Sequence, residues 1–360
     1  MHATQAHFSY GCSLTSLFMS TLTSRLYDAW HHAVLTEKVI NKFSAPRRDT
    51  LGRWEQEDQI IYGVRIQDNK FVYYARNLTQ GYDIEGATEE KRVGDTGYLC
   101  RLNSYRALRP GAGNRPLGRQ PDIPADASQC RFHCQDATHP ISLLRREPLL
   151  NVPLAHFTWN AYYNVAPLEK AGHFLWVPAT NGGTEIPHLL QRLTPELIED
   201  AVALFSQLSK SILFFNALHA GASVNHIHFQ AVAHRQSLPV ESVSLMNYKG
   251  YQLLEGYPVQ AVVFNAKEQT PELIAYVEQL QQADIPFNLA MISERIFIIA
   301  RDGDHAIVSE FPGDGLAALG MCGAIATVDR NAYNSVDAAL IESAFKKMVI
   351  PASQVIDSFS

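Results

Sequence analysis

Apolar positions along the chain recur at two spacings, which separate predicted helices from predicted strands. In residues 15–43 they follow one another at intervals of three to five, so this segment is predicted to be a helix. Residues 60–66 and 71–74 are rich in β-branched and aromatic side chains on either side of Asp68-Asn69, and are predicted to form a hairpin. Residues 162–165 and 173–177 predict a second pair of strands.

One order of elements occurs twice. Thr-Pro-Glu-Leu-Ile stands at residues 194–198 and again at residues 270–274. It suits a helix start, because Thr can accept from unpaired N–H groups, Pro fits the first turn and Glu lies at the positive end of the helix dipole. Each copy is followed by a predicted helix, a Phe-Asn pair and an alternating strand. Thr-Pro-Glu alone is a common helix opening, so it is the matching order downstream that favours a duplicated fold.

Composition narrows the class of protein. Of 360 residues, 46% are hydrophobic and 18% are charged, which excludes a disordered chain and favours two domains or one duplicated domain. The net charge of -6 argues against a generally basic nucleic-acid binder, and no apolar run reaches the length of a membrane span. Five cysteines, an odd number spread along the chain, indicate reduced thiols and a cytoplasmic location.

The candidate catalytic residues follow Asn216 in the sequence. If the segment after it is a strand, His226, His228 and Gln230 share one face and apolar residues the other. In the preceding Gly221-Ala222-Ser223, small residues let backbone N–H groups approach an oxyanion closely, and neighbouring polar side chains add donors. A neutral imidazole there can attack phosphorus and split one difficult transfer into two easier steps.

Two other interpretations of the histidines stay open. A bare His-x-His pair more often has no chemistry, and two histidines on one strand face can also ligate zinc if other ligands join them. The available sulfur and imidazole side chains are Cys130, Cys134, His133, His139, His188 and His226. The Cys-x-x-x-Cys spacing is one residue longer than in a tight zinc knuckle, and such clusters are often packed thiols or solvated loops. We therefore expect no required cofactor, with zinc left open.

The pattern G-x-S-x-N-H-φ-H-φ-Q at residues 221–230 resembles the active-site signature of the transferase branch of the histidine triad superfamily, which includes galactose-1-phosphate uridylyltransferase. The chain is most similar to the GDP-L-galactose and GDP-D-glucose phosphorylases, in order over roughly residues 98–330. The other stretches that carry the resemblance are residues 102–106, 164–169, 172–173, 257–259, 285–288 and 295–297.

The resemblance implies an α+β fold of two histidine-triad-like halves, each an antiparallel sheet with packed helices. It divides the chain into an N-terminal helical segment (residues 1–45), a catalytic half (46–240) and a second half without the histidines (241–360).

The resemblance also implies a role for each motif residue. His228 would be the nucleophile that forms a nucleotidyl-histidine, and His226 would orient the site. Gln230 stands where hydrolases of the superfamily carry a third histidine, and would bind phosphoryl oxygens. The residues implied to contact substrate are Asn216, Gly221, Ser223, Asn225, Asn103 and Arg106. For the last two, an exposed loop with a solvated charge is an equal alternative.

The implied enzyme is a nucleotidyltransferase that converts an NDP-hexose and phosphate to NDP and hexose 1-phosphate, with a GDP-hexose as donor. Its expected partners are this nucleotide sugar and phosphate, with no nucleic acid and no membrane. One alternative is a diadenosine polyphosphate phosphorylase or adenylyltransferase that uses the same His228. Another is a nucleotide-binding paralogue without turnover, because residues 319–324 lack the acidic residue and the Gly-His pair that the family tends to have there.

Overall fold

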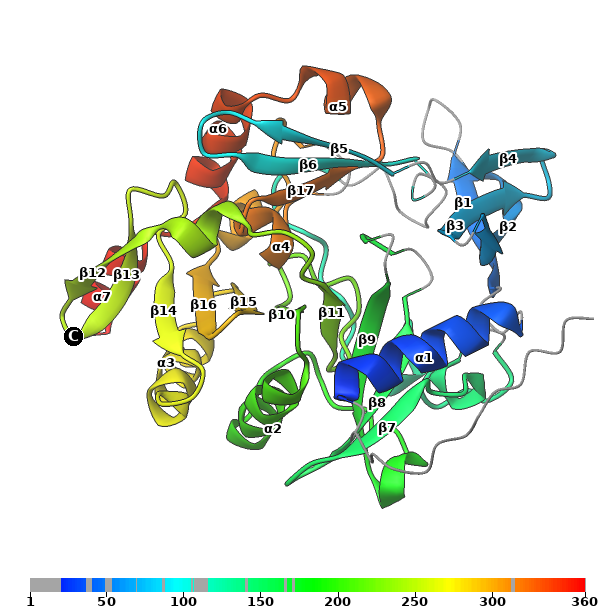
Figure 1. The fold of residues 1–360 in the computed structure, drawn as a ribbon, viewed down its shortest axis with the longest axis horizontal. Coiled ribbons are helices and arrows are strands. Elements are labelled where there is room, and N and C mark those ends of the chain that lie inside the picture. Colours follow the sequence, from blue (N-terminus) through cyan, green and yellow to red (C-terminus); the bar gives the residue numbers. More distant parts are fainter. Residues whose placement is uncertain are drawn as a thin grey trace, which may run out of the picture.

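One sheet of ten strands organises the molecule (Figure 1). The computed structural model describes residues 21–36, 41–48, 54–68, 70–85, 88–104, 106, 116–139, 142–164, 167–169, 172–311 and 315–359. From edge to edge the strands are β12 (Ser244–Tyr248), β13 (Tyr251–Glu255), β14 (Val262–Asn265), β16 (Arg295–Ala300), β15 (Phe287–Ile292), β10 (Ser211–Asn216), β11 (Phe229–Ala233), β9 (His173–Ala179), β8 (Thr158–Tyr163) and β7 (Leu150–Pro153). All neighbouring strands are antiparallel.

The sheet consists of two five-stranded halves with the same internal order. The orders β7-β8-β9-β11-β10 and β12-β13-β14-β16-β15 match strand for strand, and the halves meet where β10 pairs with β15. In each half a helix precedes the strand at this seam, α2 (Pro195–Gln207) before β10 and α3 (Thr270–Gln282) before β15. The predicted duplicated α+β fold is therefore confirmed.

The two Phe-Asn pairs are not equivalent positions of the repeat. Asn216 ends β10, whereas Asn288 is the second residue of β15, and the two are register partners across the seam. The duplication rests on the order of helices and strands and on the helix starts.

The start of α2 has the predicted capping. The Thr194 hydroxyl accepts a 3.4 Å hydrogen bond from the Leu197 N–H, and Pro195 is the first helical residue. In the second copy Thr270 already lies inside α3 and Gln269 precedes the helix without a side-chain cap. The same sequence thus begins both helices, but only the first uses its threonine as a cap.

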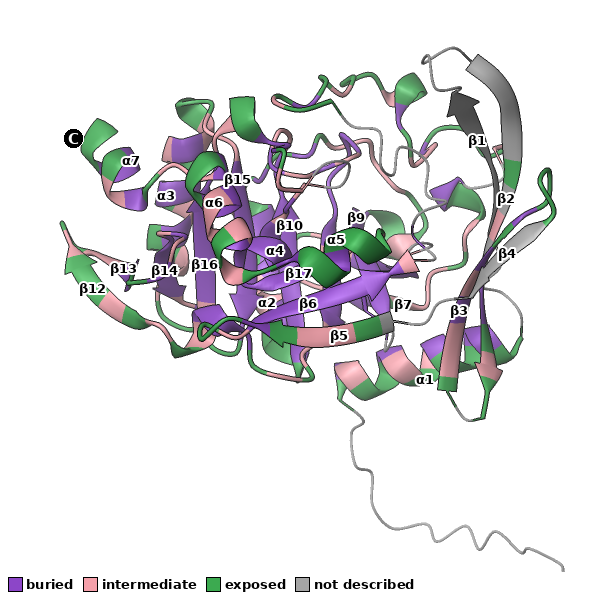
Figure 2. Ribbon diagram, turned by 90° about the horizontal axis from the view of Figure 1, so that it is seen from above, coloured by how far each residue is buried: buried purple, intermediate pink, exposed green. Residues whose placement is uncertain are grey.

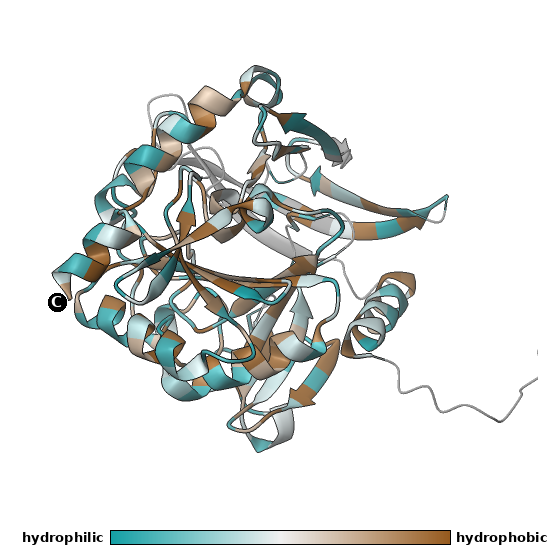
Figure 3. Cartoon of the chain, turned by 60° about the vertical axis from the view of Figure 1, so that its left-hand side comes forward, coloured by the Kyte–Doolittle hydropathy of each residue, from teal (hydrophilic) through white to brown (hydrophobic). Residues whose placement is uncertain are grey.

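The large sheet is covered on both faces. Alternate strand residues pack on α1 (Leu22–Leu35), α2, α3 and α7 (Ala352–Ser358). The residues between them face α4 (Ala318–Met321), α5 (Arg330–Ser335), α6 (Ala338–Met348) and a second sheet. The central strands are consequently buried (Figure 2). Strands carry long hydrophobic stretches, whereas the helices mix hydrophobic and hydrophilic residues (Figure 3).

The described residues also form two smaller sheets. One is β1 (Asn41–Arg48), β2 (Trp54–Gln67), β3 (Lys70–Asn77) and β4 (Tyr82–Glu85); the other is β5 (Thr88–Val93), β6 (Tyr98–Asn103) and β17 (Ala324–Thr327). The antiparallel pairing of β2 with β3 confirms the predicted hairpin, and that of β8 with β9 confirms the second strand pair. Asn69 and Val165 lie outside the described residues.

The predicted N-terminal helix is shorter than expected. Of residues 15–43, α1 occupies Leu22–Leu35, and residues 15–20 and 37–40 lie outside the described residues. The prediction was wrong for Asn41 to Phe43, which belong to β1. At the end of the helix, the N–H and the hydroxyl of Thr36 both donate to the His32 carbonyl. Among the described residues, no helix is long and apolar enough to cross a membrane.

Candidate active site

His226 and His228 lie just before β11 and not inside it, so the prediction that both are strand residues was wrong; Gln230 is on the strand. The physical reason is that their backbone bonds go to another segment. The Ile227 N–H donates to the Leu189 carbonyl at 2.8 Å, and the His228 N–H donates to the Gln191 side-chain oxygen at 3.0 Å. The two histidines are thus held in the segment that leads into β11.

The protonation pattern of His228 leaves one ring nitrogen for nucleophilic attack. Its Nδ1 lies 2.8 Å from the His226 carbonyl, which can only accept, so Nδ1 carries the proton. Nε2 then presents its lone pair, and no described residue donates to it. Burial lowers the pKa of His228 to about 4, against the opposing effect of the bond to the carbonyl, so the ring is neutral near pH 7.

Gln191, which the sequence did not indicate, joins the two ends of the motif. Its side-chain nitrogen donates to the carbonyls of Asn216 and His228 at 2.9 and 3.3 Å, while its oxygen accepts from the His228 N–H. Its own N–H donates to the Asn225 side-chain oxygen. This buried amide therefore fixes the backbone on both sides of the loop that begins after β10.

The loop itself requires glycine at its centre. Gly221 has φ 104°, and a Cβ there would lie 2.7 Å from the Cβ of Ala317 and 4.0 Å from Cγ of Asn216. The Asn216 side chain therefore borders the small-residue loop, as a phosphate site requires. Neighbouring Ser223 is half-buried, and its carbonyl accepts from Arg131 at 3.2 Å. The structure thus brings Asn216 and Gly221 together at the start of the motif, and Ser223 lies two residues further along the loop.

Gln230 is oriented by a histidine from β9. The Leu168 N–H donates to His173 Nδ1 at 3.1 Å, so the His173 proton is on Nε2, which donates to the Gln230 oxygen at 2.9 Å. Burial, and then the nearby Arg106 charge, lower the pKa of His173 to about 3, which keeps it neutral. With its oxygen occupied, Gln230 is left with its amide nitrogen as a donor.

The remaining sequence candidates are buried, and so the exposed-loop alternative for two of them does not hold. Asn103 is fully buried and donates to the Leu168 carbonyl at 3.0 Å, and Arg106 is 6% exposed beside His173. Asn225 has its amide engaged on both sides, because its nitrogen donates to the Ile123 carbonyl and its oxygen accepts from Gln191. Its observed contacts hold the loop.

Four potential metal ligands converge beside the motif. Cys130, Cys134, His188 and His226 each offer an atom within 4.8 Å of the other three. The Cys130 Sγ to His226 Nδ1 distance is 3.5 Å, and the Cys134 Sγ to His188 Nδ1 distance is 3.3 Å. A tetrahedral zinc ion with ordinary bond lengths separates sulfur from nitrogen by about 3.6 Å. The residues present therefore fit zinc.

Further contacts around these four residues support the fit. His188 Nε2 lies 3.0 Å from the Ala125 carbonyl, the kind of partner that orients a ligating histidine. His133 and His139 are not part of the group. Their rings stack on each other instead, with centroids 3.3 Å apart.

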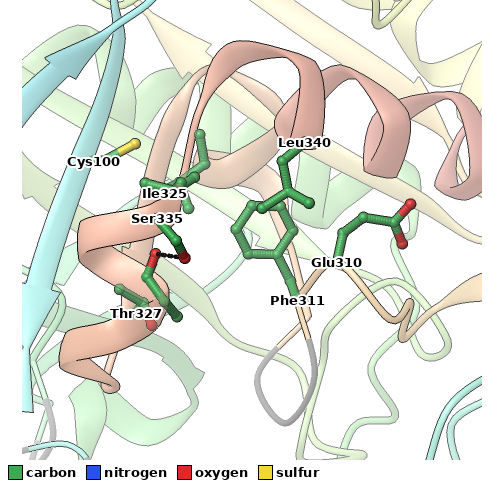
Figure 4. A pocket seen from close by; sticks show the side chains of 9 residues that line it. Cys100, Glu310, Phe311, Ile325, Thr327, Ser335 and Leu340 are labelled. Atoms are coloured by element: carbon green, nitrogen blue, oxygen red, sulfur yellow. Dashed lines mark hydrogen bonds between the residues drawn. The ribbon is translucent and has the colours of Figure 1, made fainter.

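A separate hollow beside β6, β17, α5 and α6 does not suit a nucleotide (Figure 4). Its volume is about 70 Å³, well below the several hundred Å³ usual for ligand pockets. It is lined by Cys100, Glu310, Phe311, Ile325, Thr327, Ala332, Ser335, Val336 and Leu340. None of the motif residues borders it.

Comparison with known proteins agrees with this geometry. No family model matches the chain. GDP-L-galactose phosphorylase 1 of Arabidopsis thaliana is 30% identical over 139 residues, which cover 35% of this chain and 30% of the relative. GDP-L-galactose phosphorylase 2 of the same plant is 29% identical over 151 residues, covering 38% and 33%. The chain thus spans about a third of the length of these relatives, and over that part the resemblance to the GDP-L-galactose phosphorylases is confirmed.

Solved structures extend the likeness of the fold to about three quarters of the chain. The yeast Ap4A phosphorylase Apa2 in complex with Ap4A superimposes with a TM-score of 0.52 at 16% identity, covering 74% of this chain and 90% of the yeast chain. The same enzyme without that ligand gives a TM-score of 0.50. The predicted histidine-triad-like fold is therefore confirmed.

Proposed function

We propose that this chain is a nucleotidyltransferase of the histidine triad superfamily that acts as an NDP-hexose phosphorylase. The observation that carries the proposal is the pairing at His228: Nδ1 is held as a donor by the His226 carbonyl, so Nε2 keeps its lone pair, and Gln191 ties the His228 backbone to that of Asn216 at the start of the loop. The partial sequence match to GDP-L-galactose phosphorylases favours a GDP-hexose as donor.

The proposed reaction has two displacements at the α-phosphorus. His228 Nε2 forms a P–N bond while the P–O bond to hexose 1-phosphate breaks, and this product leaves with the electron pair. An oxygen of inorganic phosphate then attacks the nucleotidyl-histidine, the P–N bond breaks, and NDP is released. The amide nitrogens of Asn216 and Gln230 would bind the phosphoryl oxygens, whose charge they stabilise in both steps.

A second donor is favoured by the fold alone. One structural neighbour is an Ap4A phosphorylase. With a diadenosine tetraphosphate as donor, the same two displacements would release a nucleoside triphosphate first and a nucleoside diphosphate second. Both donors present an α-phosphorus to the same nucleophile, so the choice depends on the base and on the group beyond the β-phosphate.

Intact-protein mass spectrometry tests the proposal. The protein is mixed, without phosphate, with GDP-glucose, GDP-mannose, UDP-glucose, ADP-glucose or diadenosine tetraphosphate. We expect a mass gain of one nucleoside monophosphate, absent in His228→Ala and discharged by phosphate. His156→Ala, which removes an exposed histidine paired with Glu199, should leave the adduct intact. A protein that is thermally stabilised by a nucleotide but forms no adduct would be a binding protein without turnover.

We also propose that Cys130, Cys134, His188 and His226 hold a zinc ion. Because four protein ligands fill a tetrahedral coordination sphere, such an ion supplies structure and takes no substrate. It would fix His226, whose carbonyl sets the tautomer of His228. This residue would then serve the site through its backbone as well as its ring.

A further inference from the structure

Two buried polar residues of the second half, Asn288 and Arg301, are bonded to each other, and Asn288 also contacts the catalytic half. Asn288 faces Asn216 across the seam between β10 and β15, and Arg301 directly follows β16. Both are fully buried. Because a buried polar group costs free energy unless it is bonded, the partners of these two residues show what they do.

Arg301 sets the orientation of the Asn288 amide. Arg301 Nη1 donates to Asn288 Oδ1 at 2.6 Å, and a guanidinium has no acceptor, so the oxygen of the amide must face it. The Asn288 nitrogen then points the other way. It donates to Asn216 Oδ1 at 2.9 Å and to the Ala220 carbonyl at 2.7 Å.

The amide of Asn216 is fixed in turn. Its oxygen accepts from Asn288 and also from the Ala318 N–H at 3.0 Å, so two donors hold it on the side of the second half. Its nitrogen has no partner among the described residues, and the side chain borders Gly221. The free donor of Asn216 is thus on the side of the loop that would hold phosphate.

We propose that Asn288 and Arg301 are positioning residues that hold the Asn216 amide with its nitrogen toward the phosphoryl group of the substrate. The inference rests on the proposed function. The opposite orientation of the amide would turn its oxygen toward the phosphate and repel it. The half that lacks the histidines thereby serves the reaction of the other half.

The charge of Arg301 adds to this arrangement. Burial lowers the pKa of Arg301 to about 9, so the guanidinium stays protonated near neutral pH. It also donates to the carbonyls of Met348 and Leu316, and no described carboxylate pairs with it. The cation therefore polarises the Arg301–Asn288–Asn216 chain of hydrogen bonds in the direction that strengthens the last donor.

Asn288→Asp tests the proposal, because aspartate keeps the shape and the contact with Arg301 but cannot donate to Asn216. The readout is the single-turnover rate of adduct formation with the best donor, corrected for folded protein. We expect a fall of about 100- to 1000-fold, the range seen when one oxyanion donor is lost. Asn247→Asp, at an exposed position of the edge strand β12 where the side-chain oxygen accepts from the Gly250 N–H, should keep the wild-type rate.

A double-mutant cycle tests whether Asn288 acts on the reaction through the Asn216 amide or only stabilises the fold. Once Asn216→Ala has removed the amide, Asn288→Asp should slow adduct formation by less than about threefold more. Equal losses in both backgrounds, or a wild-type rate in Asn288→Asp, would overturn the inference alone. If Asn288→Asp does not fold, Arg301→Lys replaces it and should show the same non-additivity. A wild-type chain that forms no adduct with any donor would overturn the proposed function, and the inference with it.

Discussion

The side-chain nitrogen of Asn288 donates a 2.9 Å hydrogen bond to the side-chain oxygen of Asn216 across the seam of the ten-stranded sheet. One residue belongs to the half with the histidines and the other to the half without them. Duplication therefore did more than enlarge the core, since the second half supplies buried polar groups at the edge of the candidate site.

Replacing Gly221 by alanine should impair both folding and adduct formation. At φ 104° a side chain costs about 1–2 kcal/mol, and the 2.7 Å approach to Ala317 adds about 1–3 kcal/mol unless the loop moves. Gly250→Ala is the control, because its φ of 89° carries a similar strain with nothing within 4 Å. Urea unfolding should show the larger loss for Gly221→Ala. Equal losses would mean that the contact with Ala317 is unimportant.

Gln191→Ala should slow adduct formation more than its effect on folding explains. The change leaves the buried His228 N–H and the Asn216 carbonyl without partners, at a cost of about 1–3 kcal/mol. It also frees the backbone of His228, the proposed nucleophile. Gln207→Ala, an exposed residue that bonds only within α2, is the matched control. A Gln191→Ala protein with the wild-type rate per folded molecule would contradict the proposal that Gln191 positions the backbone of His228.

The sequence predicted the fold well where the signals are local. The capped start of α2, the hairpins and the repeated order of elements follow from periodicity and helix-start chemistry. The parallel pairing of β6 with β17 joins Leu99 to Ala324, and nothing local in either strand specifies so distant a partner. The end of the first helix was missed because the apolar spacing of the sequence continues past Leu35 to Val39.

The site was predictable as a motif but not as a network. His188 and Gln191 come from a segment without regular structure, so no periodicity places them beside His226 and His228. The long Cys-x-x-x-Cys spacing argued against a metal site. In the structure His133 adopts φ 48°, and its N–H bonds the Cys130 carbonyl, so a left-handed turn absorbs the extra residue and returns Cys134 to the cluster.

Glu310 should contribute stability that depends on pH. Its hydrogen bond with Lys347 and others with Ser343 and Ser309 lower the pKa of the carboxyl to about 2, below the unfolded value of about 4.5. A depressed folded pKa stabilises the protein above pH 4.5, and the contribution is lost as pH falls toward 2. Glu310→Gln should cost about 1–2 kcal/mol at pH 7, since Lys347 is half-exposed. Urea unfolding of both proteins at pH 7 and pH 3 measures this; a constant difference would contradict it.

Removal of zinc should destabilise the protein and disorganise the nucleophile's surroundings. The purified chain is expected to contain one zinc ion, measured by mass spectrometry of the metal, and its cobalt form should show the visible bands of a tetrahedral thiolate complex. Cys134→Ser should lose the metal, whereas Cys100→Ser, which removes an equally buried thiol outside the cluster, should keep it. Chelation should lower the melting temperature, and free zinc at a thousandfold excess over its dissociation constant should restore about 4 kcal/mol. A chain that is metal-free after expression with ample zinc, and whose melting temperature neither chelator nor zinc changes, would show that the four side chains are only packed together.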